Sequence, residues 1–273
     1  MWLWISLGIL GGVLLISLLC VIGNNRLCTT RYTLDAEGLE KEVKIVQISD
    51  LHGKSFGKNN IKLIEKVLNE HPDFIAVTGD IIHRYTEKNK RVALRLVSVL
   101  CEIAPVLFIA GNHELRNKGY RFFRRDLIGA GALVLDDCPH NICDLTVVGL
   151  KCSSLKNDKI NAVTPEGKSV KILLAHMPQF LEKYANAGYD LVLSGHAHGG
   201  QWRIPFSRQG IYSPGQGLFP KYTQGVHTCG KTRMIISRGL GNSEFPVRLF
   251  NPPEIVTVNL IPKKQRFKTA RNT

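Results

Sequence analysis

The residues of this sequence that first suggest chemistry are two histidines in a glycine-rich turn. His196 and His198 lie in the stretch SGHAHGGQ, directly after the apolar run YDLVL. Glycine has no Cβ and lets a backbone turn sharply, so both imidazoles could approach one ion or two adjacent ions. A tight turn that merely contains histidine is the plainer alternative. The choice depends on whether other ligand-type side chains gather at the same place.

Four more apolar runs end in side chains that bind metals in proteins. Sites in open α/β sheets collect beyond the carboxyl ends of the strands, so residues that follow such runs are expected to meet. Taken singly, each has an ordinary explanation, such as a helix cap, a turn, an Asx-turn or a hydrogen-bonded structural histidine. The residues are Asp50 and His52 after run 43–49, Asp80 after 73–79, Asn112 after 105–111, and His176 after 170–175.

Together these side chains predict a centre that holds two divalent cations. Carboxylate and amide oxygens with imidazole nitrogens form a mixed hard and borderline donor set, which needs no cysteine. If these groups are buried without a cation, every acceptor needs another partner. Seven such side chains over-supply one ion, whereas two ions that share a bridging carboxylate use all of them.

The runs that carry these residues alternate with helical segments, which predicts an α/β fold. The helical segments are 59–71, 88–103, 120–131 and 179–188. Three further strand-like runs have few helices between them and are expected to add antiparallel strands: 144–150, 233–240 and 254–260. We therefore predict a two-sheet α/β sandwich flanked by helices, in one domain over residues 42–262.

The composition is basic and includes seven cysteines. Lys plus Arg number 36 against 22 acidic residues, a formal charge of +14 that attracts polyanions such as nucleic acid, an anionic membrane face or phosphorylated substrates. A basic surface that only aids solubility is the alternative. A basic tail over 263–273 is expected to be disordered. The seven cysteines are odd in number and lack regular spacing, which indicates reduced thiols rather than a disulfide framework.

The N-terminal segment predicts a membrane anchor. Residues 2–22 contain no charged side chain and reach about 31 Å as a helix, which matches a bilayer core. We expect a transmembrane anchor over 1–25 and a juxtamembrane linker over 26–41. A cleaved signal peptide is the alternative, but the run is long and no basic residue precedes it. Arg26 and Arg31 follow the span and favour a cytoplasmic globular domain.

The order of the motifs resembles a known superfamily. DLH, GD, GNHE, AH and GHAHGGQ, between Asp50 and Gln201, are similar in order to the calcineurin-like metallophosphoesterases. The later stretches SPGQGLFPKYTQGVH and SRGLGNSEFPVRLFNPPEIVTVNL resemble the membrane-associated bacterial branch of YkuE-like phosphoesterases. The resemblance implies a metallophosphoesterase-like sandwich.

The resemblance also implies a role for each site residue. One metal would be held by Asp50, His52 and His198, the other by Asn112, His176 and His196, with Asp80 bridging them. His113 would be no ligand but would face the substrate as an acid or charge stabiliser. Glu114 stands where the family often has aspartate, and its carboxylate is expected to orient His113.

These roles predict a metal-dependent phosphoric ester or pyrophosphate hydrolase. Two metals lower the pKa of a shared water, so we expect hydroxide rather than a serine or cysteine to attack phosphorus. Manganese is favoured, with iron or zinc as alternatives. The anchor suggests a phosphodiester or pyrophosphate of a lipid-linked or nucleotide-linked substrate, such as UDP-diacylglucosamine. A tethered enzyme for a soluble substrate and a non-catalytic metal-binding scaffold are the alternatives, and the anchor disfavours nucleic acid.

An aromatic and basic segment follows the histidine pair. It is expected either to form a lip that packs on a base, sugar or acyl chain while pairing with phosphate, or to be an ordinary loop. Its residues are Trp202, Phe206, Tyr212, Phe219 and Tyr222, with Arg203, Arg208 and Lys221.

Overall fold

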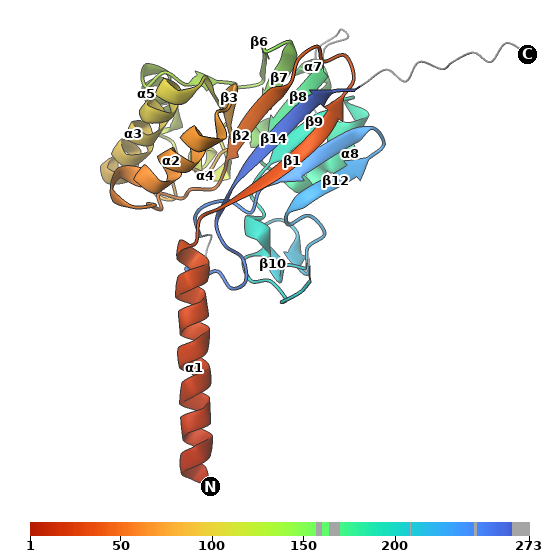
Figure 1. The fold of residues 1–273 in the computed structure, drawn as a ribbon. Helices are drawn as coiled ribbons and strands as arrows, with labels where there is room; N and C mark the ends of the chain where they lie inside the picture. Colours follow the sequence, from red (N-terminus) through yellow and green to blue (C-terminus); the bar gives the residue numbers. More distant parts are fainter. Residues whose placement is uncertain (157–159, 164–169, 208, 243–244, 264–273) are drawn as a thin grey trace, which may run out of the picture.

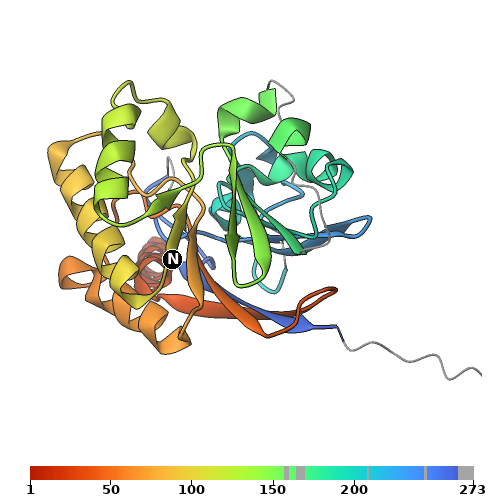
Figure 2. The ribbon, with the colours of Figure 1, turned by 90° about the horizontal axis from the view of Figure 1, so that it is seen from above.

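Two six-stranded β-sheets pack face to face, and a long N-terminal helix stands apart from them (Figure 1, Figure 2). The computed structural model describes residues 1–156, 160–163, 170–207, 209–242 and 245–263. The first sheet has the order β1 (Cys28–Ala36), β14 (Glu254–Pro262), β2 (Val43–Ile48), β3 (Phe74–Val77), β4 (Val106–Phe108) and β5 (Leu133–Val134). The second has the order β12 (Gly225–Cys229), β13 (Thr232–Ile236), β9 (Leu191–Ser194), β8 (Val170–Ala175), β7 (Leu145–Leu150) and β6 (Cys138–Ile142).

The central strands are apolar on both faces because both faces are covered. Every residue of β3, β4 and β9 is buried. Their inner side chains meet in one cluster between the sheets, and full burial of each such side chain contributes about 1.5–3 kcal/mol. The inner cluster includes Ile45, Phe74 and Leu107 from the first sheet and Ile172, Leu191 and Ile235 from the second.

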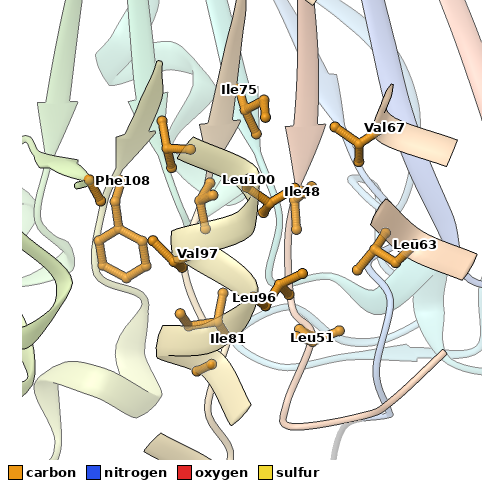
Figure 3. Packing of buried hydrophobic residues seen from close by; sticks show 14 of the residues in the cluster. Ile48, Leu51, Leu63, Val67, Ile75, Ile81, Leu96, Val97, Leu100 and Phe108 are labelled. Carbon is orange, nitrogen blue, oxygen red and sulfur yellow. The ribbon is translucent and has the colours of Figure 1, made fainter. Parts of the chain in front are cut away.

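Three helices cover the outer face of the first sheet: α2 (Ile61–Glu70), α3 (Glu87–Ile103) and α5 (Tyr120–Gly129). The apolar residues of α2 and α3 recur at helical spacing and point at the sheet, where Leu96 and Leu100 pack with Ile48 and Ile75 (Figure 3). The hydroxyl of Thr86 caps α3 by accepting the Asn89 N–H at 3.2 Å. The predicted helices therefore form the outer layer.

Shorter helices cover the second sheet: α6 (Cys152–Lys156), α7 (Ile160–Val163) and α8 (Leu181–Asn186), which follows the 3₁₀ turn η2 (Pro178–Phe180). Leu181 and Tyr184 of α8 are buried against Leu173, Val192 and Met234. The result is the predicted α/β sandwich with helices on both outer faces. The seven cysteines are all unpaired, as their spacing predicted.

The structure differs from the prediction in the segment after the N-terminal helix. Residues 26–41 were expected to be a linker, yet Cys28–Ala36 forms the edge strand β1 and pairs in parallel with all of β14. The stretch is rich in β-branched and aromatic residues, such as Thr29, Thr30 and Tyr32, which suit a half-buried strand. The pairing joins residues more than 220 positions apart, which no local pattern could indicate.

The predicted antiparallel additions were only partly right. β14 runs antiparallel to β2, as expected. β7 and β13, however, run parallel to β8 and β9. Each of these strands is separated from its neighbour by a long connection, which permits a parallel crossover. The antiparallel strands of the second sheet are instead its two edges, β6 and β12, which the sequence did not indicate.

The helix α1 (Trp2–Asn25) and a small hairpin lie at one end of the sandwich (Figure 1). The hairpin consists of β10 (Tyr212–Ser213) and β11 (Gly217–Leu218). α1 is long and apolar enough to cross a bilayer, a property that a signal sequence shares. Of the predicted tail only Lys263 is described, and Arg208 of the aromatic segment also lies outside the described residues.

Candidate metal centre

The predicted ligands meet at the carboxyl ends of the parallel strands in both sheets. The loops after β2, β3 and β4 approach from the first sheet, and those after β8 and β9 from the second. Asn112 opens the short helix α4 (Asn112–Leu115), and His198 opens the 3₁₀ turn η3 (His198–Gly200). The seven side chains that the structure brings together are Asp50, His52, Asp80, Asn112, His176, His196 and His198.

The first group of donors consists of Asp50, His52 and His198. The Nε2 atoms of His52 and His198 lie 3.1 Å apart. Asp50 Oδ1 lies 3.4 Å from His198 Nε2 and 3.9 Å from His52 Nε2. Three donor atoms at such spacing can share one cation.

The second group surrounds His176. Its Nε2 lies 3.1 Å from Asp80 Oδ2, 3.2 Å from Asn112 Oδ1 and 3.2 Å from His196 Nδ1. Its other nitrogen, Nδ1, lies 2.7 Å from the carbonyl oxygen of Thr78, so Nδ1 carries a proton and Nε2 is the nitrogen that faces the group. This contact fixes the ring orientation that a metal ligand needs.

Asp80 lies between the two groups. Its Oδ2 is 3.1 Å from His176 Nε2 in one group and 3.8 Å from His52 Nε2 in the other. The second oxygen, Oδ1, accepts the His113 backbone N–H at 2.8 Å, which sets the plane of the carboxylate. One carboxylate thus faces both groups.

The backbone around the ligands is strained in a regular way. Asp50, His52, Asp80, His196 and His198 all have positive φ values, between 48° and 65°. Residues other than glycine adopt this left-handed region at a cost of about 1–2 kcal/mol each, and such strain is common at functional sites. The turns direct side chains from different strands to one point.

Small residues make the close approach of the loops possible. A methyl group at Gly195 would lie 1.9 Å from Ser49 Oγ, and one at Gly111 would lie 2.1 Å from Asp80 Oδ1. Hydrogen bonds hold the loops together, since the Asp50 N–H donates to the Gly79 carbonyl at 3.0 Å. The glycines of the motifs therefore serve the packing of the ligand loops.

Burial keeps most of the imidazoles neutral. It lowers the pKa of His52 and of His196 to about 3, and that of His198 well below its ordinary value. Neutral imidazole is the form that binds a metal. His176 behaves differently: burial opposes its charge, but Asp80 and Asp50 raise its pKa to about 10. The two carboxylates therefore favour a positive charge between them.

The donor set fits divalent cations. Imidazole nitrogens that face one another at 3.1 and 3.2 Å have one proton or none between them, and a cation would use both lone pairs. Carboxylate, amide and imidazole donors suit manganese, iron or zinc. Asp50 and Asp80 bring two negative charges into a buried place, which two cations would neutralise.

His113 lies beside the first group without joining it. Its Nδ1 is 3.3 Å from the carbonyl oxygen of His83, and its ring lies 4.7 Å from that of His52. The sequence analysis missed His83, whose Nδ1 is 3.3 Å from His52 Nδ1. Its position three residues after Asp80, in the same loop, was the available signal. The three rings of His52, His83 and His113 form one rim of the centre.

Glu114 has a different role from the one predicted. Its carboxylate accepts the backbone N–H groups of Asp80 at 2.8 Å, Gly111 at 2.9 Å and Ile82 at 3.2 Å. It therefore fastens the loop of Asp80 to the start of α4 instead of orienting His113, which the His83 carbonyl does. The longer arm of glutamate reaches these donors across the two loops.

Arg248 connects the centre to the N-terminal helix. It is fully buried, its Nη2 lies 3.4 Å from His198 Nδ1, and its guanidinium donates to the carbonyls of Arg238 and Gly241. Its backbone N–H donates to Asn24 Oδ1 at 3.2 Å, in the last turn of α1. Burial lowers the pKa of Arg248 to about 10, which leaves it protonated at neutral pH. No local pattern in the sequence indicated this contact.

An α/β sandwich whose strand ends gather two donor groups around a shared carboxylate defines a metal-binding domain of the hydrolase type. The family model described as calcineurin-like phosphoesterase matches residues 43–200. The chain belongs to this family, and it is a metal-dependent phosphoester hydrolase.

Two curated relatives agree with this assignment. The metallophosphoesterase YkuE of Bacillus subtilis is 30% identical over 80% of this chain and 78% of its own length. The phosphodiesterase YaeI of Escherichia coli is 27% identical over 80% of this chain and 82% of its own length. Among solved structures, TT1561 of Thermus thermophilus covers 72% of this chain and 90% of that chain, at 13% identity and a TM-score of 0.49.

Proposed function

We propose that this chain is a membrane-anchored phosphoesterase with two divalent metals that hydrolyses a phosphodiester or pyrophosphate bond. The observation that carries the proposal is the position of Asp80, whose Oδ2 faces His176 at 3.1 Å and His52 at 3.8 Å. A carboxylate in that position supports a pair of cations with one bridging ligand. Asp50, His52 and His198 would hold the first ion, and Asn112, His176 and His196 the second, with manganese favoured over iron or zinc.

The side chains of the centre divide the work of hydrolysis. When bound, such a metal pair supplies an activated water and neutralises the phosphoryl oxygens. His113 stands at the rim and is the residue to protonate or stabilise the leaving oxygen. Its Nδ1 faces the His83 carbonyl, so Nε2 is the atom free to face the substrate. Glu114 and Thr78 keep Asp80 and His176 in place through the hydrogen bonds described above.

The proposed anchor is α1. An 18-residue window of α1 has a mean hydropathy of 2.7, and none of its residues is buried in the protein. A helix that is apolar on all sides and exposed to solvent is unfavourable in water but suited to lipid. Arg26 and Arg31 follow the helix and favour a cytoplasmic globular domain. An anchored site would meet lipid-linked phosphoesters, of which UDP-diacylglucosamine is one candidate.

The alternative is a tethered enzyme that acts on a soluble phosphoester. The name of the YaeI relative, a phosphodiesterase, favours diesters over monoesters within this alternative. A non-catalytic scaffold is disfavoured because the full donor set is brought together and His113 stands beside it.

The decisive experiment compares three variants of the full chain in detergent. Asp80→Asn should lose both metal and turnover of bis-p-nitrophenyl phosphate. His113→Gln should keep its metal but lose activity by about 10²–10⁴-fold, the usual contribution of a general acid. His71→Asn, at an exposed histidine that ends α2, is the control and should match the parent protein.

Elemental analysis and turnover with added Mn²⁺ are the two measurements. Full activity and full metal content in Asp80→Asn would refute the proposed centre. Equal turnover of p-nitrophenyl phosphate and the diester would instead point to a general phosphatase.

A further inference from the structure

The small hairpin beside the metal centre encloses an apolar pocket. The pocket has a volume of about 370 Å³, a size typical of small-molecule sites. Its apolar lining comes from Trp202, Ile211, Tyr212, Leu218 and Phe245.

Two polar side chains of the pocket wall are engaged within the protein. The Gln201 side chain donates to the carbonyls of Phe245 and Val247 at 2.7 and 3.0 Å. The indole N–H of Trp202 donates to the Val247 carbonyl at 2.9 Å. The walls are therefore suited to a ligand that makes few hydrogen bonds.

The pocket lies next to the metal centre. Gly200, one of its lining residues, is separated from the ligand His198 by a single residue. At the turn of the hairpin, a methyl group on Gly215 would lie 3.8 Å from His196 Nε2. Leu218, in the pocket wall, is three residues further along the chain, so its Cα lies at most about 10 Å from that of Gly215. The pocket wall and the turns that carry the ligands therefore adjoin each other.

Exposed apolar side chains stand in the pocket wall and in segments connected to it. Leu218 and Phe219 are 68% and 62% exposed, and Phe250 is 45% exposed. Trp202 pairs with Leu249 in an isolated bridge. The residue before Leu249, Arg248, donates its backbone N–H to Asn24 of α1. Figure 1 shows β10 level with the end of α1 that adjoins the sandwich. This surface would face the lipid into which α1 inserts.

We infer that the pocket binds one hydrocarbon chain of a phosphoester lipid while its phosphoryl group occupies the metal centre. The inference rests on the proposed function and names the substrate class for it. An apolar pocket whose wall includes Gly200, two residues from the ligand His198, matches a molecule with an alkyl chain on one side of the phosphoryl group. A chain lifted from the bilayer exchanges one apolar environment for another, so it can leave the membrane without exposure to water.

The kinetic test is a series of p-nitrophenyl alkyl phosphodiesters, from methyl to octyl, below their aggregation limits. For the parent protein kcat/KM should rise two- to fourfold with each added methylene until the pocket is filled, since full burial of a methylene is worth about fourfold. Leu218→Gln should flatten this rise. Leu68→Gln is the matched control, because Leu68 is a 50% exposed leucine on α2, and it should keep the parent slope.

A second measurement does not depend on turnover. Trp2→Phe with Trp4→Phe leaves Trp202 as the one remaining tryptophan of the three. Its fluorescence should change saturably with octyl phosphate and not with methyl phosphate. Equal responses to the two, a flat chain-length series, or a Leu218→Gln variant with the parent slope would each overturn the pocket assignment. Chain-dependent binding without any metal-dependent turnover would leave the pocket standing and refute the phosphoesterase proposal.

Discussion

Glu114→Gln is the substitution that best tests how hydrogen bonds to the ligand loops hold the centre. The glutamate Oε2 accepts two N–H groups, from Asp80 at 2.8 Å and Gly111 at 2.9 Å, and Oε1 accepts that of Ile82 at 3.2 Å. Glutamine can keep its oxygen on the first pair, but then its NH₂ group faces the Ile82 N–H. Two donors would meet in a place where Glu114 is 1% exposed.

The cost follows from the number of donors left without an acceptor. Burial and the charge of Asp80 raise the pKa of Glu114 to about 8, but a protonated carboxyl oxygen still accepts a hydrogen bond and an amide nitrogen does not. One buried, unsatisfied N–H costs about 1–3 kcal/mol, so glutamine should lower the free energy of unfolding by that amount. Alanine would leave three donors unsatisfied, about 3–9 kcal/mol, comparable to the whole stability of a domain.

Urea denaturation in one detergent, followed by circular dichroism, measures this loss. The metal affinity, measured alongside, should be about 10–100-fold weaker in Glu114→Gln, because the loop of Asp80 is no longer fully held by hydrogen bonds. Glu102→Gln is the control, because Glu102 is an exposed glutamate of α3, and it should stay within about 0.5 kcal/mol of the parent. Parent stability and parent metal affinity in Glu114→Gln would refute this account of the loop.

Two further perturbations test the surface and the anchor. Arg31 and Thr257 donate to Glu70, and although burial opposes them these bonds lower the pKa of Glu70. A carboxyl with a lowered folded pKa stabilises above its unfolded pKa, so Glu70→Gln should cost about 1 kcal/mol at pH 7, and the difference should shrink as the pH falls through the folded pKa, below the ordinary value of 4.5. A difference that is unchanged at pH 3 would contradict this. In brominated phosphatidylcholine vesicles, Trp202→Phe keeps only Trp2 and Trp4, and their fluorescence should be quenched if α1 spans the bilayer. The control is Phe122→Trp on α5 in a protein whose three native tryptophans are replaced by phenylalanine, and its fluorescence should not be quenched. Unquenched fluorescence of Trp2 and Trp4 would refute the anchor.

The sequence alone indicated which side chains gather at the strand ends. Metal-type side chains at the ends of apolar runs are a local signal, because the chain must turn there and the carboxyl ends of parallel strands share one edge. The helical spacing in α2 and α3 was likewise visible, since one face of each helix must be buried. These features depend on residues close together in the chain.

Other features depend on contacts between segments that are distant in the chain. β1 pairs with β14 across more than 220 positions, Glu114 serves backbone donors of a neighbouring loop, and Arg248 joins α1 to His198. The pocket of the hairpin needs Phe245 from a segment far from Trp202 and Leu218. Such contacts arise when the sheets close on each other, and their partners are chosen by space and by unsatisfied hydrogen-bonding groups rather than by neighbours in the sequence.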